Sequence, residues 1–223
     1  MPQNPGAIRV VARATAIIRD EEGRFFLTFH PKQNHYFLVG GKAQYTEGKR
    51  IGKDIAETFS HIGRASEFVS YLFNMKRESS RAAGTREVWE ELKESRIVSP
   101  MRWATAKKQF SLKSSLPAIE ILNLCDNPHS GYRPQIDTKN IILPCEMRLP
   151  PKWEREVYSR WVKEKDRRDV TPIVWFATPT EIYNVHTTRG FKISPDVRHI
   201  LLRLGFIPPI ESLSSGPPKE DDP

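Results

Sequence analysis

The chain has 223 residues, of which 38% are hydrophobic and 28% charged, and it carries a formal net charge of +8 at neutral pH. This length allows a hydrophobic core that needs neither disulfides nor a structural metal ion. No stretch approaches the roughly 20 apolar residues of a membrane-spanning helix. The two cysteines, Cys125 and Cys145, form no CxxC motif, and arginines interrupt the apolar N-terminal run, so that it lacks a signal-peptide core. We therefore expect a cytoplasmic or nuclear protein with no membrane partner.

Three strands are predicted in the N-terminal part. Ile8–Ile18 is rich in β-branched residues, and the turn sequence DEEG separates it from a second apolar run, Phe25–Phe29, which predicts a hairpin. The short strand Tyr36–Val39 runs directly into Gly40 and Gly41. Paired glycines after a strand indicate either a positive φ or a close approach of another group.

A long connection and an acidic helix follow. Apolar residues recur at helical spacing within Ile55–Met75, and a link of this length between a strand and a helix is unusual. We therefore predict an insertion over residues 48–78. Residues 79–94 are expected to form a helix with Ser79 or Ser80 as its N-cap and with Val88 and Leu92 as its buried stripe.

The C-terminal part predicts further strands at 119–124, 141–143 and 173–176. A charged helical segment covers 150–169, with Trp153, Val157 and Trp161 as a narrow apolar stripe. The last helix begins at Ser194 and Pro195 and ends at Gly205. Residues 1–210 are thus expected to form a single domain, and 211–223 a disordered tail.

Three carboxylates lie on one side of the acidic helix. Glu87, Glu90 and Glu91 are three and four residues apart, and each such like-charge pair destabilises a helix by roughly 0.2–0.5 kcal/mol. Neighbouring arginines and lysines would offset this repulsion, and so would a divalent cation, because hard cations prefer carboxylate oxygens. The helix by itself leaves both alternatives open.

The order strand, Gly-Gly and acidic helix resembles the Nudix hydrolase family. The second half of the family's signature is present as Arg86-Glu87-Val88-Trp89-Glu90-Glu91, and the first half as Gly41 followed six positions later by Glu47. Two features depart from the signature. Between Glu47 and Arg86 there are 38 residues where the family has seven, and Lys93-Glu94 stands where the family has a closing glycine and an apolar residue. Glu57 and Glu78 are therefore alternative candidates for the first-half glutamate, although Glu47 keeps its glycine partner.

The resemblance implies an α/β domain of the α+β type, the Nudix fold, in which a mixed sheet lies between the acidic helix and the C-terminal helix. It implies hydrolysis of a phosphoanhydride, a diphosphate linked to another group, with Mg²⁺ or Mn²⁺ held by Glu87, Glu90 and Glu91. By the same resemblance, Glu90, Glu91, Arg86 and Glu47 are catalytic, with Arg86 paired to the first-half glutamate, and Gly40, Gly41 and Lys42 contact the substrate. A later acidic residue serves as base in many members, and Glu120, Glu146 and Glu154 are the candidates.

Other functions remain open. The insertion and the missing glycine would also suit a catalytically inactive Nudix-fold module that binds nucleotide or RNA. The positive net charge favours polyanionic partners and so allows an RNA-directed activity, but the basic residues are scattered, which equally suits a basic protein without such a partner. A homodimer is possible. The sequence does not identify the diphosphate substrate.

Overall fold

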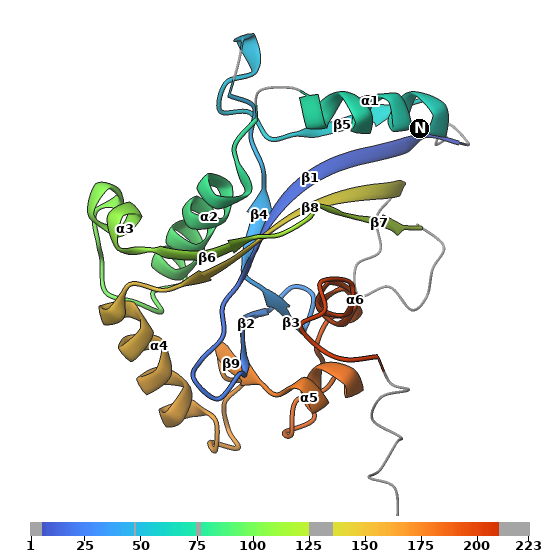
Figure 1. Ribbon diagram of the computed structural model, residues 1–223. Coiled ribbons are helices and arrows are strands. Elements are labelled where there is room, and N and C mark those ends of the chain that lie inside the picture. Colours follow the sequence, from blue (N-terminus) through green and yellow to red (C-terminus); the bar gives the residue numbers. More distant parts are fainter. Residues whose placement is uncertain (1–5, 47, 75–76, 125–135, 210–223) are drawn as a thin grey trace, which may run out of the picture.

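The computed structural model describes residues 6–46, 48–74, 77–124 and 136–209. Its larger sheet is mixed and is built around β1 (Ile8–Ile17), which pairs in parallel with β8 (Asp137–Arg148). On the other side of β1 lie β4 (Gly40–Lys42) and β5 (Ala56–Phe59), both antiparallel to it. β6 (Ser111–Ser115) and β7 (Ile119–Asn123) pair antiparallel with β8. Together with the helices, this sheet gives the mixed α/β architecture that the sequence predicted (Figure 1).

A second, three-stranded antiparallel sheet has the order β3 (His35–Leu38), β2 (Phe25–His30), β9 (Val174–Ala177). The DEEG turn connects β1 to β2 as predicted, and the turn is closed by hydrogen bonds between Asp20 and Arg24. Beyond a bridge from Arg19 to Phe25, however, the two strands separate into different sheets. Of the predicted hairpin, therefore, only the turn is present, because β2 pairs with β3 and β9 and not with β1.

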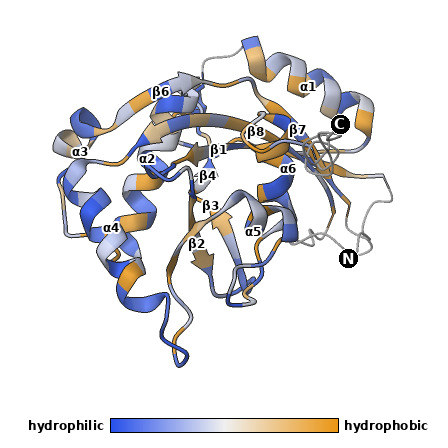
Figure 2. Cartoon of the chain, turned by 60° about the horizontal axis from the view of Figure 1, so that its bottom comes forward, coloured by the Kyte–Doolittle hydropathy of each residue, from blue (hydrophilic) through white to orange (hydrophobic). Residues whose placement is uncertain are grey.

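Six α-helices lie in the described part of the chain. They are α1 (Ile62–Asn74), α2 (Ser80–Glu94), α3 (Trp103–Gln109), α4 (Pro151–Glu164), α5 (Pro179–Asn184) and α6 (Pro195–Arg203), and a 3₁₀ turn covers Gly48–Arg50. None of these helices is long and apolar enough to span a membrane. In Figure 2 the hydrophobic colour concentrates on the strands in the interior, whereas α4 carries hydrophilic residues along much of its length.

Alternation along β1 gives the larger sheet two different faces. Val10, Ala12 and Ala14 are buried beneath α1 and the start of α2. Arg13 and Thr15 point to the opposite face and line a cavity there, together with residues of α6. Because successive strand residues alternate between faces, α2 and α6 cover opposite sides of the sheet.

The helix α2 begins and packs as its sequence predicts. The Ser79 side chain accepts a hydrogen bond from the Ala82 N–H, and Val88 and Leu92 are fully buried. Gly84 lies so close to β8 that an added Cβ would be 2.4 Å from the Cys145 sulfur. The first half of α2 therefore sits directly on the sheet, and this close contact fixes where its acidic second half lies.

The insertion is part of the core. Glu78 returns the chain to Gln44, since the Glu78 N–H donates to the Gln44 carbonyl over 3.0 Å, and the Gln44 N–H donates to the Glu78 carboxylate over 3.1 Å. Between them, β5 extends the sheet beside β1, and α1 buries Val69 and Leu72 against it. The helical pattern expected over 55–75 is thus a strand, 56–59, followed by the helix 62–74.

The C-terminal elements follow the prediction in part. In α4, Trp153, Val157 and Trp161 are buried, and α6 is capped by the Ser194 hydroxyl and followed by Gly205 at a φ of +71°. The strand expected at 141–143 is much longer, and three short elements, α3, β6 and α5, were not among those predicted from the sequence. Residues 211–223 and Cys125 lie outside the described residues.

Candidate active site

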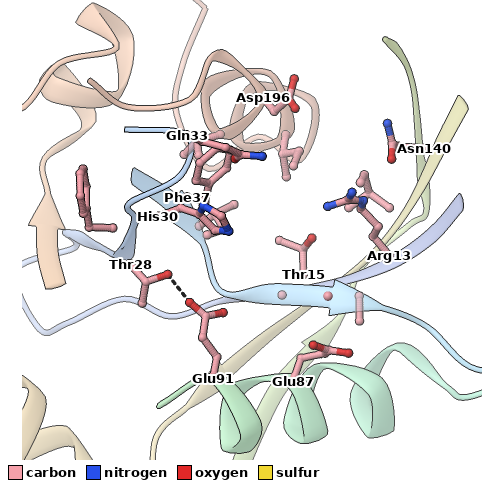
Figure 3. A pocket seen from close by; sticks show the side chains of 18 of the residues that line it. Arg13, Thr15, Thr28, His30, Gln33, Phe37, Glu87, Glu91, Asn140 and Asp196 are labelled. Atoms are coloured by element: carbon pink, nitrogen blue, oxygen red, sulfur yellow. Dashed lines mark hydrogen bonds between the residues drawn. The ribbon is translucent and has the colours of Figure 1, made fainter. Parts of the chain in front are cut away.

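A cavity of about 560 Å³ lies where β4 passes between α2 and α6. Its lining includes Gly40 and Gly41 of β4 and the carboxylates Glu87, Glu90 and Glu91 of α2. Figure 3 shows Glu87 and Glu91 on the α2 side of β4, and Arg13, Asn140 and Asp196 on the other side. The volume suits a small-molecule site, for which roughly 300–1,000 Å³ is usual.

Arg86 joins α2 to β4. Its guanidinium contacts both oxygens of Glu78, over 2.8 and 3.0 Å, and also donates to the Lys42 carbonyl over 3.0 Å. The Arg86 and Glu78 side chains are only 16% and 15% exposed, and a two-pronged, charge-assisted contact of this kind is among the stronger interactions on a protein. Hydrogen bonding to Glu78 raises the pKa of Arg86 further above its usual range. This contact holds the Gly-Gly strand against the acidic helix.

The three glutamates considered as partners of Arg86 have different surroundings. Glu78 makes the contact just described. Glu57 instead accepts hydrogen bonds from Tyr45 and Arg50 at the surface of the insertion. Glu47, the sequence-based preference, lies outside the described residues. Among the residues described, Glu78 is the partner that reaches Arg86 from outside α2.

Gly41 leaves the space that Glu87 occupies. A Cβ added at Gly41 would lie 1.8 Å from a carboxylate oxygen of Glu87, and one added at Gly40 would lie 2.3 Å from the Ala14 carbonyl. A side chain at Gly40 would therefore collide with the backbone of β1, and one at Gly41 would displace the Glu87 carboxylate. Burial raises the pKa of Glu87, although the adjacent Arg86, 2.7 Å away, opposes this shift.

Glu91 is the most deeply held of the three carboxylates. The Thr28 hydroxyl donates to it over 2.5 Å, and the Gly40 N–H also donates to it. Burial raises the pKa of Glu91 to about 7, in spite of these two donors. Two strands from different sheets, β2 and β4, therefore fix one carboxyl group of α2 at the cavity.

The chemistry of these side chains suits a hard divalent cation, since all three offer carboxylate oxygens. In the arrangement described, however, no group of three or more His, Cys, Asp or Glu residues is placed to hold a metal ion within the described ranges. The reason is visible at Arg86, which contacts Glu87 over 2.7 Å and Glu90 over 3.1 Å. A cation would have to take over contacts that the arginine makes here.

The other predicted site residues are spread over a wider area. The Lys42 ammonium group is 3.0 Å from Asp54 of the insertion, and both side chains are nearly half exposed. None of the three candidate bases lines the cavity. Glu120 pairs with Lys139, Glu146 pairs with Arg19, and Glu154 lies exposed on α4.

Cys145 offers no nucleophile to the site. The thiol is 1% exposed, and burial raises its pKa to about 12. It therefore stays protonated at neutral pH and acts as a small apolar side chain under α2.

Sequence reasoning missed the far wall of the cavity. Arg13, Asn123, Asn140 and Asp196 lie there, and they come from four different elements. The only signal was a polar residue at an inward position of a strand, as in the alternation around Asn123 and Asn140. Asp196 looked like an ordinary acidic residue of the first helical turn.

No protein-family model matches the chain, and no curated protein matches it.

Proposed function

We propose that this chain is a Nudix-type, divalent-metal-dependent hydrolase of a diphosphate linked to another group. The observation that carries the proposal is the contact of Arg86 with Glu78 and with the Lys42 carbonyl. This contact holds a Gly-Gly strand against a helix whose three glutamates line a cavity. The arrangement agrees with the role that the family resemblance implies for Arg86, with Glu78 as its first-half partner.

The spacing of the signature supports Glu78 over the alternatives. Seven residues separate Glu78 from Arg86. Two hydrogen bonds join Gln44 to Glu78, so that the chain returns at Glu78 to the end of β4 that it left at Gln44. If the 31 residues 45–75 are left out, Gly41 and Glu78 are six positions apart, as the signature requires. On this proposal the arginine and all four glutamates of the box are present, its closing glycine is replaced by Lys93, and a packed insertion interrupts its first half.

Glu87, Glu90 and Glu91 are the residues that would hold Mg²⁺ or Mn²⁺. When bound, such an ion lowers the pKa of a coordinated water and offsets charge on the diphosphate. Thr28 and the Gly40 N–H orient Glu91, and Arg86 positions the loop as well as Glu87 and Glu90. Gly40 and Gly41 line the cavity and have no side chain that would keep a phosphate away from the backbone. Lys42 follows them in β4, with its ammonium group paired to Asp54.

A hydrolysis screen tests the proposal: cleavage of the diphosphate yields two phosphomonoesters, and added alkaline phosphatase releases inorganic phosphate from these products but not from the intact compound. A panel of diphosphate compounds is incubated with Mg²⁺ or Mn²⁺ and either wild type, Glu90→Gln or Glu91→Gln, with Glu67→Gln on the exposed face of α1 as the matched control. We expect metal-dependent release by the wild type and by the control, and its loss in the two α2 variants. Full activity in both α2 variants would exclude the proposed roles.

One observation favours a second candidate, a Nudix-fold module that binds a nucleotide or RNA without turnover. Arg86 neutralises Glu87 and Glu90 in the structure, and this contact alone already offsets the repulsion among the helix carboxylates. Tight ligand binding by a folded protein, with no product after long incubation with Mn²⁺, would favour this function over hydrolysis.

A further inference from the structure

The cavity has a second polar end, away from the α2 carboxylates. On the sheet, Asn140 of β8 lies beside Ile121 of β7, and Asn123 is further along β7. Asp196, at the start of α6, accepts a hydrogen bond from Asn123 and interacts with the charge of Arg13. All four polar residues line the cavity that Glu87 and Glu91 enter from the other side of β4 (Figure 3).

Asn140 makes an unusual contribution to this end. Its residue surface is 5% exposed, and its side-chain oxygen is buried and accepts no hydrogen bond from the described residues. A buried acceptor without a donor costs free energy, so such groups are uncommon in folded proteins and often mark a site where a ligand or water supplies the donor. Asn140 lines the cavity, and because the terminal torsion of asparagine is soft, a ligand there can supply the missing donor.

The walls between the polar groups are apolar. Ile121 and Ile142 lie on the sheet side, and Val197 and Ile200 lie on α6. A ligand between these walls can satisfy its hydrogen-bonding groups only at its edge, since its two faces meet aliphatic side chains. A flat ring with polar groups on one edge fits this description better than a sugar or an inositol does, because their hydroxyls surround the whole ring and those directed at the aliphatic side chains would stay unpaired.

The polar groups define the kind of edge that is recognised. A carboxylate at Asp196 and the Asn140 oxygen are acceptors, so the ligand edge must be rich in N–H donors. Arg13 has five N–H donors and can serve a ring carbonyl while it remains near Asp196. Among the common bases, guanine alone combines a ring N–H, an adjacent amino group and a carbonyl on one edge, whereas adenine places a ring acceptor beside its amino group.

We propose that Asp196 and Asn140 determine substrate specificity by binding a guanine-type base, with the attached phosphates directed towards the α2 carboxylates. The position of the phosphates rests on the proposed function, but recognition of the base does not. Asp196 accepts from the ring N–H and the amino group, and Asn140 accepts a further donor at the same edge.

Titration calorimetry without added metal tests this inference. The full chain is titrated with the monophosphates of guanosine, adenosine, inosine and xanthosine. We expect guanosine monophosphate to bind most tightly and inosine monophosphate, which lacks the amino group, to bind more weakly. In Asp196→Asn, guanosine monophosphate should lose about tenfold or more in affinity, as expected for one discriminating contact to a base. Xanthosine monophosphate should gain affinity, because the new amide can donate to its second carbonyl.

Asn140→Leu separates recognition from folding. The variant removes the buried side-chain oxygen that accepts no hydrogen bond from the described residues, and an apolar side chain of similar size should leave the thermal stability unchanged or raise it. The same variant should bind guanosine monophosphate roughly fivefold or more weakly. Glu67→Gln, on the exposed face of α1, is the control and should bind like the wild type.

Three results would overturn the inference: no binding of any monophosphate, equal binding of all four, or unchanged base preference in Asp196→Asn. The measurement involves no hydrolysis. Base-selective binding without turnover in any assay would therefore refute the proposed function and leave this inference standing. Hydrolysis that is indifferent to the base would do the reverse.

Discussion

Replacing Glu78 by alanine tests the contact on which the site depends. The Arg86–Glu78 pair is about 15% exposed on each side, and removing one partner of a fully buried pair costs about 3–5 kcal/mol. Residual exposure and the remaining contacts of Arg86 with Glu87 and Glu90 reduce this cost, to about 2 kcal/mol on the same scale. The Gln44 N–H also loses its side-chain acceptor, which adds about 1 kcal/mol.

The expected loss for Glu78→Ala is therefore about 3 kcal/mol, which lowers the midpoint of thermal unfolding by about 6–12 °C for a chain of this size. Urea unfolding at pH 7 measures it directly. The control is Glu57→Ala, whose pair with Arg50 is 35–52% exposed and should contribute less than about 1 kcal/mol. If the two variants unfold at the same urea concentration, Glu78 does not hold the strand to the helix and the reasoning is wrong.

Three further predictions concern close packing and charge. Gly41→Ala places a methyl group 1.8 Å from a carboxylate oxygen of Glu87. The carboxylate must move by more than about 1 Å to relieve this contact, and such a displacement should reduce metal-dependent turnover about 100-fold; turnover like that of the wild type would contradict the geometry. Gly84→Ala places its Cβ 2.4 Å from the Cys145 sulfur and should lower the free energy of unfolding in urea by about 1–3 kcal/mol. The double variant with Cys145→Ala should recover most of this lost stability. Additive effects of the two substitutions would contradict the contact. Burial raises the pKa of Glu146, but Arg19 and a neighbouring lysine lower it more, so its pKa is below the usual value. Folding therefore favours the ionised form of Glu146. Arg19→Met should lower the free energy of unfolding at pH 7, and this loss should shrink as the pH falls through the ordinary glutamate pKa of about 4.3 and below. A loss that is constant with pH would refute this assignment.

The local elements followed from local chemistry. Ser79 and Ser194 cap their helices, and the buried stripes of α2 and α4 lie where the apolar spacing predicted them. Capping and amphipathic spacing depend on residues within a few positions of one another, so the sequence contains the necessary information. The insertion was also recognisable as an interruption, but its strand was not, because β5 exists only through its pairing with β1.

The sequence by itself determined that three carboxylates share one face of a helix and that two glycines precede it. It did not determine which glutamate meets Arg86. Glu78 reaches Arg86 because a packed insertion returns the chain to Gln44. The far wall of the cavity was likewise decided by tertiary structure, since Arg13, Asn140 and Asp196 are distant in the sequence and become neighbours only when α6 covers the sheet. Spacing along a helix is fixed by its pitch, whereas contacts between separate elements depend on how the whole chain packs, and a single sequence shows the first and not the second.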